Sequence, residues 1–202
     1  MELLLKNALT AHYGLQPATV TGITIQTSDQ YFEIEDDQNR ETVLHLTRGS
    51  GMAVYNNPNS YHITIVNYDK FLTALPHAFG VGKKRCDLIV YTNNNYNYFI
   101  LNELKDRNPK EQVKNKATAQ LLETLNCILA VPDIKTFSDK FTDRRCCYIN
   151  KKIQSPPALT ATTSFNRINL LTKNGFKMSS LDINALGFDF YEYYGGHSIT
   201  LN

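Results

Sequence analysis

The chain of 202 residues is predicted to adopt a mixed α/β fold, of the α+β type with a mixed sheet. Stretches rich in β-branched and aromatic residues recur through its first third, separated by clusters of turn-forming residues. One long amphipathic helical pattern lies between a pair of closely spaced apolar runs and a later apolar run. Hydrophobic residues make up 42% of the chain and aromatic residues 11%, which is sufficient for a substantial core.

Residues 1–75 are predicted to form a helix and then a β-rich antiparallel meander. Leucines at positions 3, 4, 5 and 9 give residues 2–13 an amphipathic pattern that ends before Gly14. Strands are expected at 19–27, 30–35, 42–48 and 61–66, with a short helix at 69–75. This part either embellishes the domain formed by residues 76–202 or stands beside it as a small appendage.

The centre of the chain predicts a hairpin followed by a crossover connection. Residues 85–91 (RCDLIVY) and 98–104 (YFILNEL) are typical of strands, and an Asn-rich loop joins them. Apolar residues at near 3.6-residue spacing predict a helix over 110–130, which Pro132 closes, and 145–151 predicts another strand. A helix that leads back to a strand beside its predecessors produces a mixed sheet.

The C-terminal part is an extension of this core. After Pro156 and Pro157, the pattern predicts a strand at 164–171, a helix at 179–186 and an aromatic strand at 188–194. Ser179 or Ser180 would cap the helix.

Composition restricts the class of protein. No run of 18 apolar residues occurs, which excludes a membrane-spanning helix, and the N-terminus makes a poor signal peptide. The four cysteines show no CxxC pair, so a reducing cytoplasm is the expected location. The net charge of +2 conceals a segregation: residues 1–75 carry −4, whereas 83–116 and 135–152 carry +4 each. The middle of the chain is therefore the part that would attract a polyanion.

The predicted hairpin brings two carboxylates together. If its loop centres on Asn95, antiparallel pairing sets Tyr91 opposite Phe99 and Ile89 opposite Leu101. The same register sets Asp87 opposite Glu103, and Lys105 shares that face because side chains alternate along a strand. Like charges placed opposite each other are destabilising, and a divalent cation between them would reverse that effect.

These residue types suit magnesium chemistry. Mg²⁺ prefers oxygen ligands and is commonly held by one or two carboxylates, waters and substrate phosphate oxygens. Asp87, Glu103 and the backbone carbonyl of Leu104 would be the metal ligands. Lys105 would orient or deprotonate the attacking water, or balance charge at phosphorus. Mn²⁺ is the expected substitute for Mg²⁺.

Two strings here, CDLIV at 86–90 and ILNELK at 100–105, resemble the PD-(D/E)xK motif of the restriction-endonuclease-like nucleases. The resemblance covers about residues 83–151 and implies a core of helix, three strands, helix and strand. It also implies magnesium-dependent cleavage of phosphodiester bonds, usually in DNA, with Asp87, Glu103 and Lys105 as catalytic residues. Cys86 replaces the motif's proline.

The resemblance also implies accessory residues. Many members carry a further Glu on the first core helix, for which Glu2 is one candidate here and Asp69 a poorer one. Lys116 and Gln120, four apart on one helix face, would match a Lys or Gln that some members carry after the motif. Nucleic-acid contacts are expected from six basic residues: Lys83, Lys84, Arg85, Arg107, Lys110 and Lys114.

The expected function is thus a DNA endonuclease of restriction, defence or repair, acting on double-stranded DNA, as a homodimer if both strands are cut. Two other classes stay open. One is a non-catalytic nucleic-acid-binding or assembly module that retains the fold. The other is a β-rich interaction protein in which Asp87 and Glu103 are surface residues neutralised by Lys84, Arg85 and Lys105.

Overall fold

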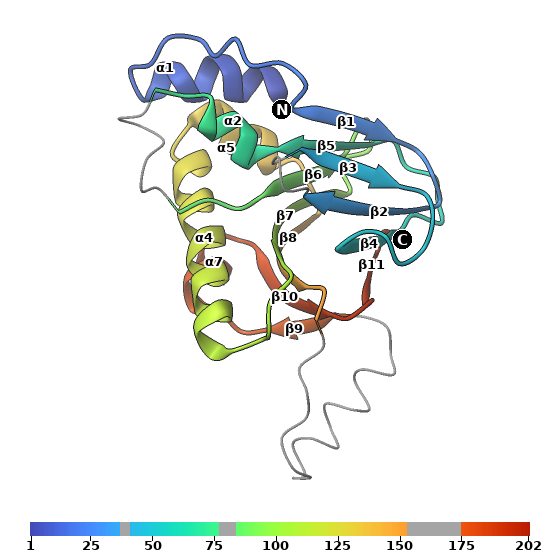
Figure 1. The fold of residues 1–202 in the computed structure, drawn as a ribbon. Coiled ribbons are helices and arrows are strands. Elements are labelled where there is room, and N and C mark those ends of the chain that lie inside the picture. The colour runs from blue at the N-terminus through green and yellow to red at the C-terminus, as the bar shows by residue number, and fades with distance from the viewer. Residues whose placement is uncertain (37–40, 77–83, 153–174) are drawn as a thin grey trace.

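The computed structural model describes residues 1–36, 41–76, 84–152 and 175–202. The predicted strand at 164–171 and the candidate contact residue Lys83 lie outside these ranges. The described residues form a mixed α+β structure with three layers, in which helices and a smaller sheet lie on opposite sides of a larger sheet (Figure 1). The predicted class is thereby confirmed.

The larger sheet has seven strands in the order β1-β5-β6-β7-β8-β10-β9. The β7–β8 and β8–β10 pairs are parallel, and the other pairs in this sheet are antiparallel. The bounds are β1 Thr24–Thr27, β5 Ile63–Asn67, β6 Leu88–Thr92, β7 Tyr98–Lys105, β8 Asp143–Asn150, β9 Phe176–Met178 and β10 Asp189–Tyr194.

The smaller sheet has four strands in the order β11-β4-β2-β3. Their bounds are β2 Tyr31–Asp36, β3 Thr42–His45, β4 Ala53–Asn56 and β11 Ser198–Thr200. The expected N-terminal meander is wrong in its pairing, because β1 pairs with β5 in the larger sheet while β2 pairs with β3 and β4. Every residue of β5 is buried, so this strand needs partners on both edges, and β1 and β6 supply them.

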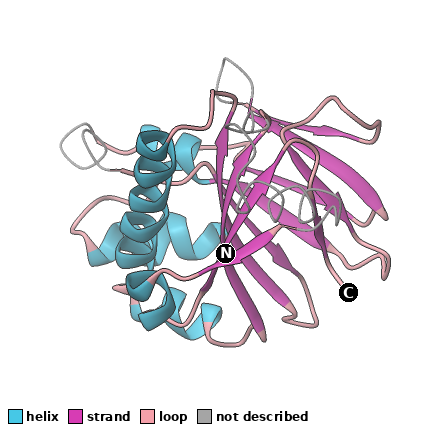
Figure 2. Cartoon of the chain, turned by 90° about the horizontal axis from the view of Figure 1, so that it is seen from below, coloured by secondary structure: helices cyan, strands magenta, loops and turns pink. Residues whose placement is uncertain are grey.

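The helices gather on one side of the strands, as Figure 2 shows. They are η1 Leu4–Leu9, which continues into α1 Thr10–His12, then α2 Tyr68–Thr73, α4 Glu111–Leu129, α5 Pro132–Ser138 and α7 Leu181–Ala185. The apolar stripe predicted for the long helix is confirmed, since Ala117, Leu121, Leu125 and Ile128 of α4 are all buried. Pro132 begins α5 instead of only closing α4, because proline suits the first position of a helix.

Alternation along β7 assigns its residues to two separate cores. Phe99 and Leu101 lie in the core between the larger sheet and the helices, whereas Ile100 and Leu104 lie in the core between the two sheets. Side chains two residues apart point to the same face, so Glu103 points to the helix side with Leu101. The sequence pattern thereby sets a charged residue under α4.

The predicted hairpin and crossover are confirmed. β6 pairs with β7 in the register Tyr91↔Phe99 and Ile89↔Leu101, and α4 leads from β7 to the adjacent parallel strand β8. Strands β4, β9 and β11 were not expected from the sequence, and two of them are only three residues long. Ser180 is the N-cap residue of α7 but makes no side-chain cap hydrogen bond. None of the described helices is both long enough and apolar enough to cross a membrane.

Candidate functional site

The hairpin brings Asp87 and Glu103 to the same end of the sheet. Glu103 lies near the end of β7, and Asp87 lies one residue before β6 begins. The Leu104 backbone N–H donates a hydrogen bond of 2.6 Å to Asp87 Oδ2, and the Asp87 N–H donates to the Asn102 carbonyl at 3.0 Å. Beyond the last β6–β7 pair, Leu88↔Asn102, the backbone of β7 therefore bonds to the side-chain carboxylate of Asp87 and no longer to a backbone carbonyl of β6.

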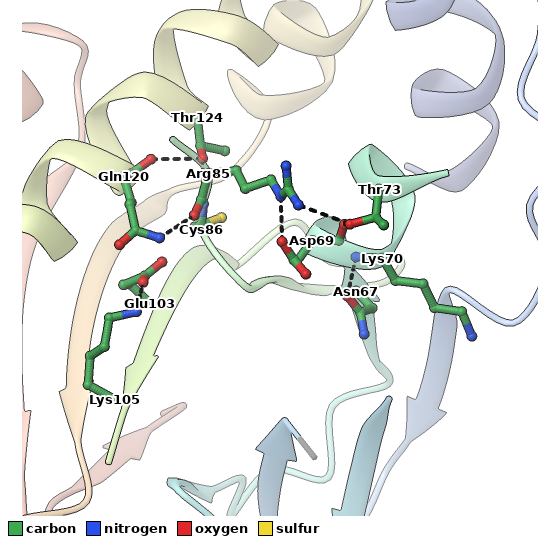
Figure 3. A network of polar contacts seen from close by, with 10 residues as sticks. All are labelled: Asn67, Asp69, Lys70, Thr73, Arg85, Cys86, Glu103, Lys105, Gln120 and Thr124. Carbon is green, nitrogen blue, oxygen red and sulfur yellow. Dashed lines mark hydrogen bonds and ion pairs between the residues drawn. The ribbon is translucent and has the colours of Figure 1, made fainter. Parts of the chain in front are cut away.

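Three elements fix the chain around Asp87. At the start of α2, the backbone N–H groups of Tyr68 and Asp69 donate to the Asp87 carbonyl at 2.9 and 3.2 Å. From α4, Gln120 Nε2 donates to the Arg85 carbonyl at 2.8 Å. The Cys86 N–H donates to Thr124 Oγ1, also at 2.8 Å. Figure 3 shows the bonds of Gln120 and Thr124 to residues 85 and 86. Because all of these are backbone anchors, the position of Asp87 depends on two helices as well as on its own strand.

Helix α2 adds a third acidic group beside the pair. Asp69 accepts an ion-paired hydrogen bond from Arg85 Nε, and Arg85 Nη2 also donates to Thr73 Oγ1 at 2.9 Å. The N-cap residue Asn67 accepts from the Lys70 N–H at 2.8 Å, which starts the helix at this point. Arg85 is therefore held against α2 (Figure 3).

Glu103 is fully buried, and only one of its two carboxylate oxygens has a hydrogen-bond partner. Its Oε1 pairs with Lys105 Nζ, so the two side chains share a face as predicted, and the Lys105 side chain is 16% exposed. Its Oε2 is buried and has no hydrogen-bond partner, and the same is true of Gln120 Oε1. Gln120 extends from α4 toward the end of β7 that carries Glu103 and Lys105 (Figure 3). Two buried acceptor oxygens without a donor mark a place suited to a cation or a water.

Burial raises the pKa values of both carboxyls. Burial is the main cause of the rise in the pKa of Asp87 to about 6, and the positive charge of Lys105 opposes it. Burial also raises the pKa of Glu103 well above 4.5, and the negative charge of Asp87 adds to this effect. The charge of Asp69 raises the pKa of both groups further. Perturbation of this kind is common at functional sites.

A pocket of about 260 Å³ opens beside Lys105, between the end of β7 and α4. Both candidate accessory residues, Lys116 and Gln120, line it. The other lining residues are Lys105, Arg107, Gln112 and Val113. Lys116 and Arg107 are exposed, so cationic side chains reach solvent at the mouth of the pocket.

Of the remaining candidate nucleic-acid contacts, two form ion pairs within the protein and two are exposed. Lys114 forms an ion pair of 2.6 Å with Glu192 on β10, and Arg85 pairs with Asp69 as described above. Lys84 and Lys110 are exposed. Arg107, at the pocket, is the candidate contact that lies nearest to Lys105 in the chain.

The two carboxyls at this end of the sheet supply oxygen atoms, the ligand type that hard divalent cations prefer. Two carboxyls, one with an unpartnered buried oxygen, lie beside each other without enough positive charge from Lys105 to lower their pKa values. The N–H and C=O of one strand residue point to the same side, so the Leu104 carbonyl faces Asp87, beyond the last β6–β7 pair. In the described parts of the chain, no cluster of three or more His, Cys, Asp or Glu residues suited to a metal is found.

The two upstream acidic candidates have different neighbours in the structure. Glu2, just before η1 begins, accepts from Lys6 and from Thr24, both at 2.6 Å. Asp69 instead lies beside Asp87. Its signal in the sequence was a capped turn, Asn67 followed by Asp69, directly after an apolar strand, but only the pairing of β5 with β6 brings that turn to the site.

Known proteins provide no further guide to this site. Neither a protein-family model nor a curated protein nor a solved structure matches the chain.

Proposed function

We propose that the protein is a magnesium-dependent nuclease that hydrolyses phosphodiester bonds, with Asp87, Glu103 and Lys105 as its catalytic residues. The observation that carries the proposal is the pair of carboxyls at the end of one hairpin, with Glu103 fully buried, its Oε2 unpartnered and Lys105 on the same face. Such a pair is costly in the absence of a cation, because both groups are desolvated and repel each other. Retention of that cost is expected at a functional site.

The order of elements supports a restriction-endonuclease-like core. Strands β5, β6 and β7 are adjacent in the sheet, and α4 then leads to β8 on the far side of β7. A helix precedes these strands at the N-terminus, although β1 to β4 follow it and α2 lies between β5 and β6. The sequence strings that resemble the PD-(D/E)xK motif occupy β6, β7 and their flanks.

Asp87, Glu103 and the Leu104 carbonyl would hold Mg²⁺, with Mn²⁺ as a substitute. When bound, the metal would polarise the phosphate and lower the pKa of a water. The protein groups act around this centre. Lys105 Nζ, already beside Glu103, is placed to orient the attacking water or to balance charge at phosphorus. Gln120 presents a free carboxamide oxygen toward the same space, and Lys116 can contact a flanking phosphate.

The proposed substrate is double-stranded DNA. One site cuts one strand, so cleavage of both strands would require two copies of the chain or two successive events. Restriction, defence and repair all use such an activity, and the site chemistry is common to them.

The test is a cleavage assay with purified protein. Plasmid DNA, linear DNA and RNA are incubated with Mg²⁺, with Mn²⁺ and with EDTA, in parallel with Lys105→Ala and with the surface variant Lys140→Ala. We expect metal-dependent cleavage that Lys105→Ala abolishes and Lys140→Ala preserves. Metal-independent cleavage, or equal cleavage by Lys105→Ala, would refute the proposed site. Binding without cleavage in any metal would instead indicate a non-catalytic nucleic-acid-binding module.

A further inference from the structure

The turns that follow β7 and β8 are joined by a buried asparagine that the site described above does not include. Asn150 Nδ2 donates to the Arg107 carbonyl at 3.0 Å and to Tyr148 Oη at 3.1 Å. Asn150 Oδ1 accepts from the Arg107 N–H at 3.4 Å and from the Lys152 N–H at 3.2 Å. One side chain thus uses both ends of its amide to hold two backbone turns side by side.

These turns are basic, and residues 106, 107, 151 and 152 within them are exposed. They comprise residues 105–107 and 150–152, which carry Lys105, Arg107, Lys151 and Lys152 against the single acidic residue Asp106. Lys152 Nζ lies 3.7 Å from Asp106, with both side chains 51% exposed. Exposed ion pairs of this kind contribute little, so a phosphate can compete with Asp106 for Lys152.

Two other cations, Arg145 and Lys114, are bound to protein partners. Arg145 is bound to Asp143 by two hydrogen bonds of 2.7 and 2.5 Å, and its guanidinium lies over the rings of Tyr98 and Tyr191. Lys114 pairs with the buried Glu192. The basic turns differ from these groups, since Lys151 and Lys152 are exposed and have only weak contacts, at 3.5 Å to the Ser50 carbonyl and 3.7 Å to Asp106.

The turn at 150–152 begins on the strand next to Lys105, the proposed catalytic lysine. Lys105 pairs with Asn150 in the parallel β7–β8 ladder, and the Lys151 N–H donates to the Lys105 carbonyl at 2.8 Å. Lys105 lines the pocket beside α4, whereas Lys151 Nζ contacts the Ser50 carbonyl, in the loop between β3 and β4 of the smaller sheet. A nucleic-acid strand that contacts both lysines would therefore cross the ends of β7 and β8, which lie about 4.8 Å apart as neighbouring strands.

We infer that the turns at 105–107 and 150–152, held together by Asn150, form a second phosphate-binding subsite for the nucleic-acid strand that enters the pocket beside Lys105. This inference rests on the proposed function for its ligand class and extends it by naming the path of the strand. Arg107, Lys151 and Lys152 contact the backbone. Asn150 is a positioning residue that acts through them.

The subsite is tested by binding measured without cleavage. A fluorescent 20-base-pair DNA and a 20-nucleotide single strand are titrated with the protein in EDTA at several salt concentrations. Lys151→Ala/Lys152→Ala is compared with Lys135→Ala/Lys140→Ala, which removes the same charge near the opposite end of β8. Loss of two phosphate contacts should weaken binding by roughly 25- to 60-fold in 0.1 M salt and reduce the salt slope by about 1.4 to 1.8.

A positioning role for Asn150 predicts a distinct pattern. Asn150→Ala should weaken binding while all charges remain, whereas Asn150→Ser, which keeps a donor and an acceptor, should restore part of the affinity. Circular dichroism and thermal unfolding of each variant check that it is folded. If Asn150→Ala fails to fold, the lysine variants still decide the matter.

The outcomes separate the inference from the proposed function. Equal affinity and salt slope for the 151/152 variant and the 135/140 control would overturn the subsite, even if the wild-type protein cleaves DNA with Mg²⁺. A reduced slope in the 151/152 variant without cleavage by the wild type would support the subsite and reject the nuclease. Absence of salt-sensitive binding by the wild type would reject both.

Discussion

Two buried glutamates, one in each sheet, differ in the hydrogen-bond partners of their carboxylates. Glu33 on β2 is 1% exposed, and Glu103 on β7 is 0% exposed. Glu33 accepts hydrogen bonds from the hydroxyl of Tyr31, from the Gly49 N–H at 2.7 Å and from the Gly51 N–H at 2.6 Å. Glu103 has Lys105 on one oxygen and nothing on the other.

The pKa values of these two groups move in opposite directions. Burial alone would raise the pKa of Glu33, but the hydrogen bonds from Tyr31 and from the backbone of Gly49, Gly51 and Ser50 lower it overall. Burial raises the pKa of Glu103, and repulsion from Asp87 adds to it. Glu33 is thus a structural anchor for the loop that contains Gly49 and Gly51, whereas Glu103 Oε2 has no hydrogen-bond donor among the described residues.

The largest effect that would sharpen this comparison is on activity. Glu103→Gln should reduce kcat by about 10³-fold or more, because it removes a metal-binding charge from the reaction centre. Glu33→Gln should leave the activity of the folded fraction within about threefold of wild type. The measurement is single-turnover cleavage of DNA in Mg²⁺ at a temperature where both variants are folded. Equal losses in the two variants would show that the contrast between the glutamates is not functional.

A smaller effect is expected on the free energy of unfolding, and here Glu33→Gln should be the more damaging of the two variants. Glu33→Gln should lower the free energy of unfolding by about 2–4 kcal/mol, because an amide N–H₂ would face backbone N–H donors that now bind a carboxylate. Glu103→Gln should cost much less or nothing, since the native environment already opposes its charge. Urea unfolding at pH 7 in EDTA measures both. A greater loss for Glu103→Gln than for Glu33→Gln would contradict the comparison.

The pH dependence of Asp87→Asn gives the smallest of the three effects. The pKa of Asp87 is raised from 3.8 to about 6, so the folded state binds this proton more tightly than the unfolded state does. The resulting stability is present in full below pH 3.8 and is lost as the pH rises through 6. Asp87→Asn should therefore stabilise the metal-free protein by on the order of 1–3 kcal/mol at pH 8, and not at pH 4.

Thermal unfolding in EDTA at the two pH values measures this difference. Because Glu33 has a lowered pKa, its own contribution follows the opposite course: it is present above pH 4.5 and lost as the pH falls through the lowered value. Asp29→Asn is a suitable control, since Asp29 is a surface loop residue. A variant Asp87→Asn that is less stable than wild type at pH 8 would show that the carboxylate is a structural anchor like Glu33.

The core of the candidate site follows directly from local sequence. An Asn-rich loop of fixed length sets the register of β6 and β7, and the two-residue period of a strand then puts Glu103 and Lys105 on one face. The buried stripe of α4 follows in the same way from its 3.6-residue period. Each of these features depends on residues close together in the chain, so the local pattern carries enough information.

Only the tertiary structure decided which distant residues join that site. Asp69 reaches Asp87 because β5 pairs with β6. Gln120 and Thr124 anchor residues 85 and 86 because α4 crosses the sheet there. Asn150 joins two turns because β8 lies beside β7. The division of the N-terminal strands between two sheets is of the same kind. Sequence periodicity determines which face of a helix or strand is buried. The choice of the neighbouring helix or strand depends on packing over the whole core, which no single segment of the sequence specifies.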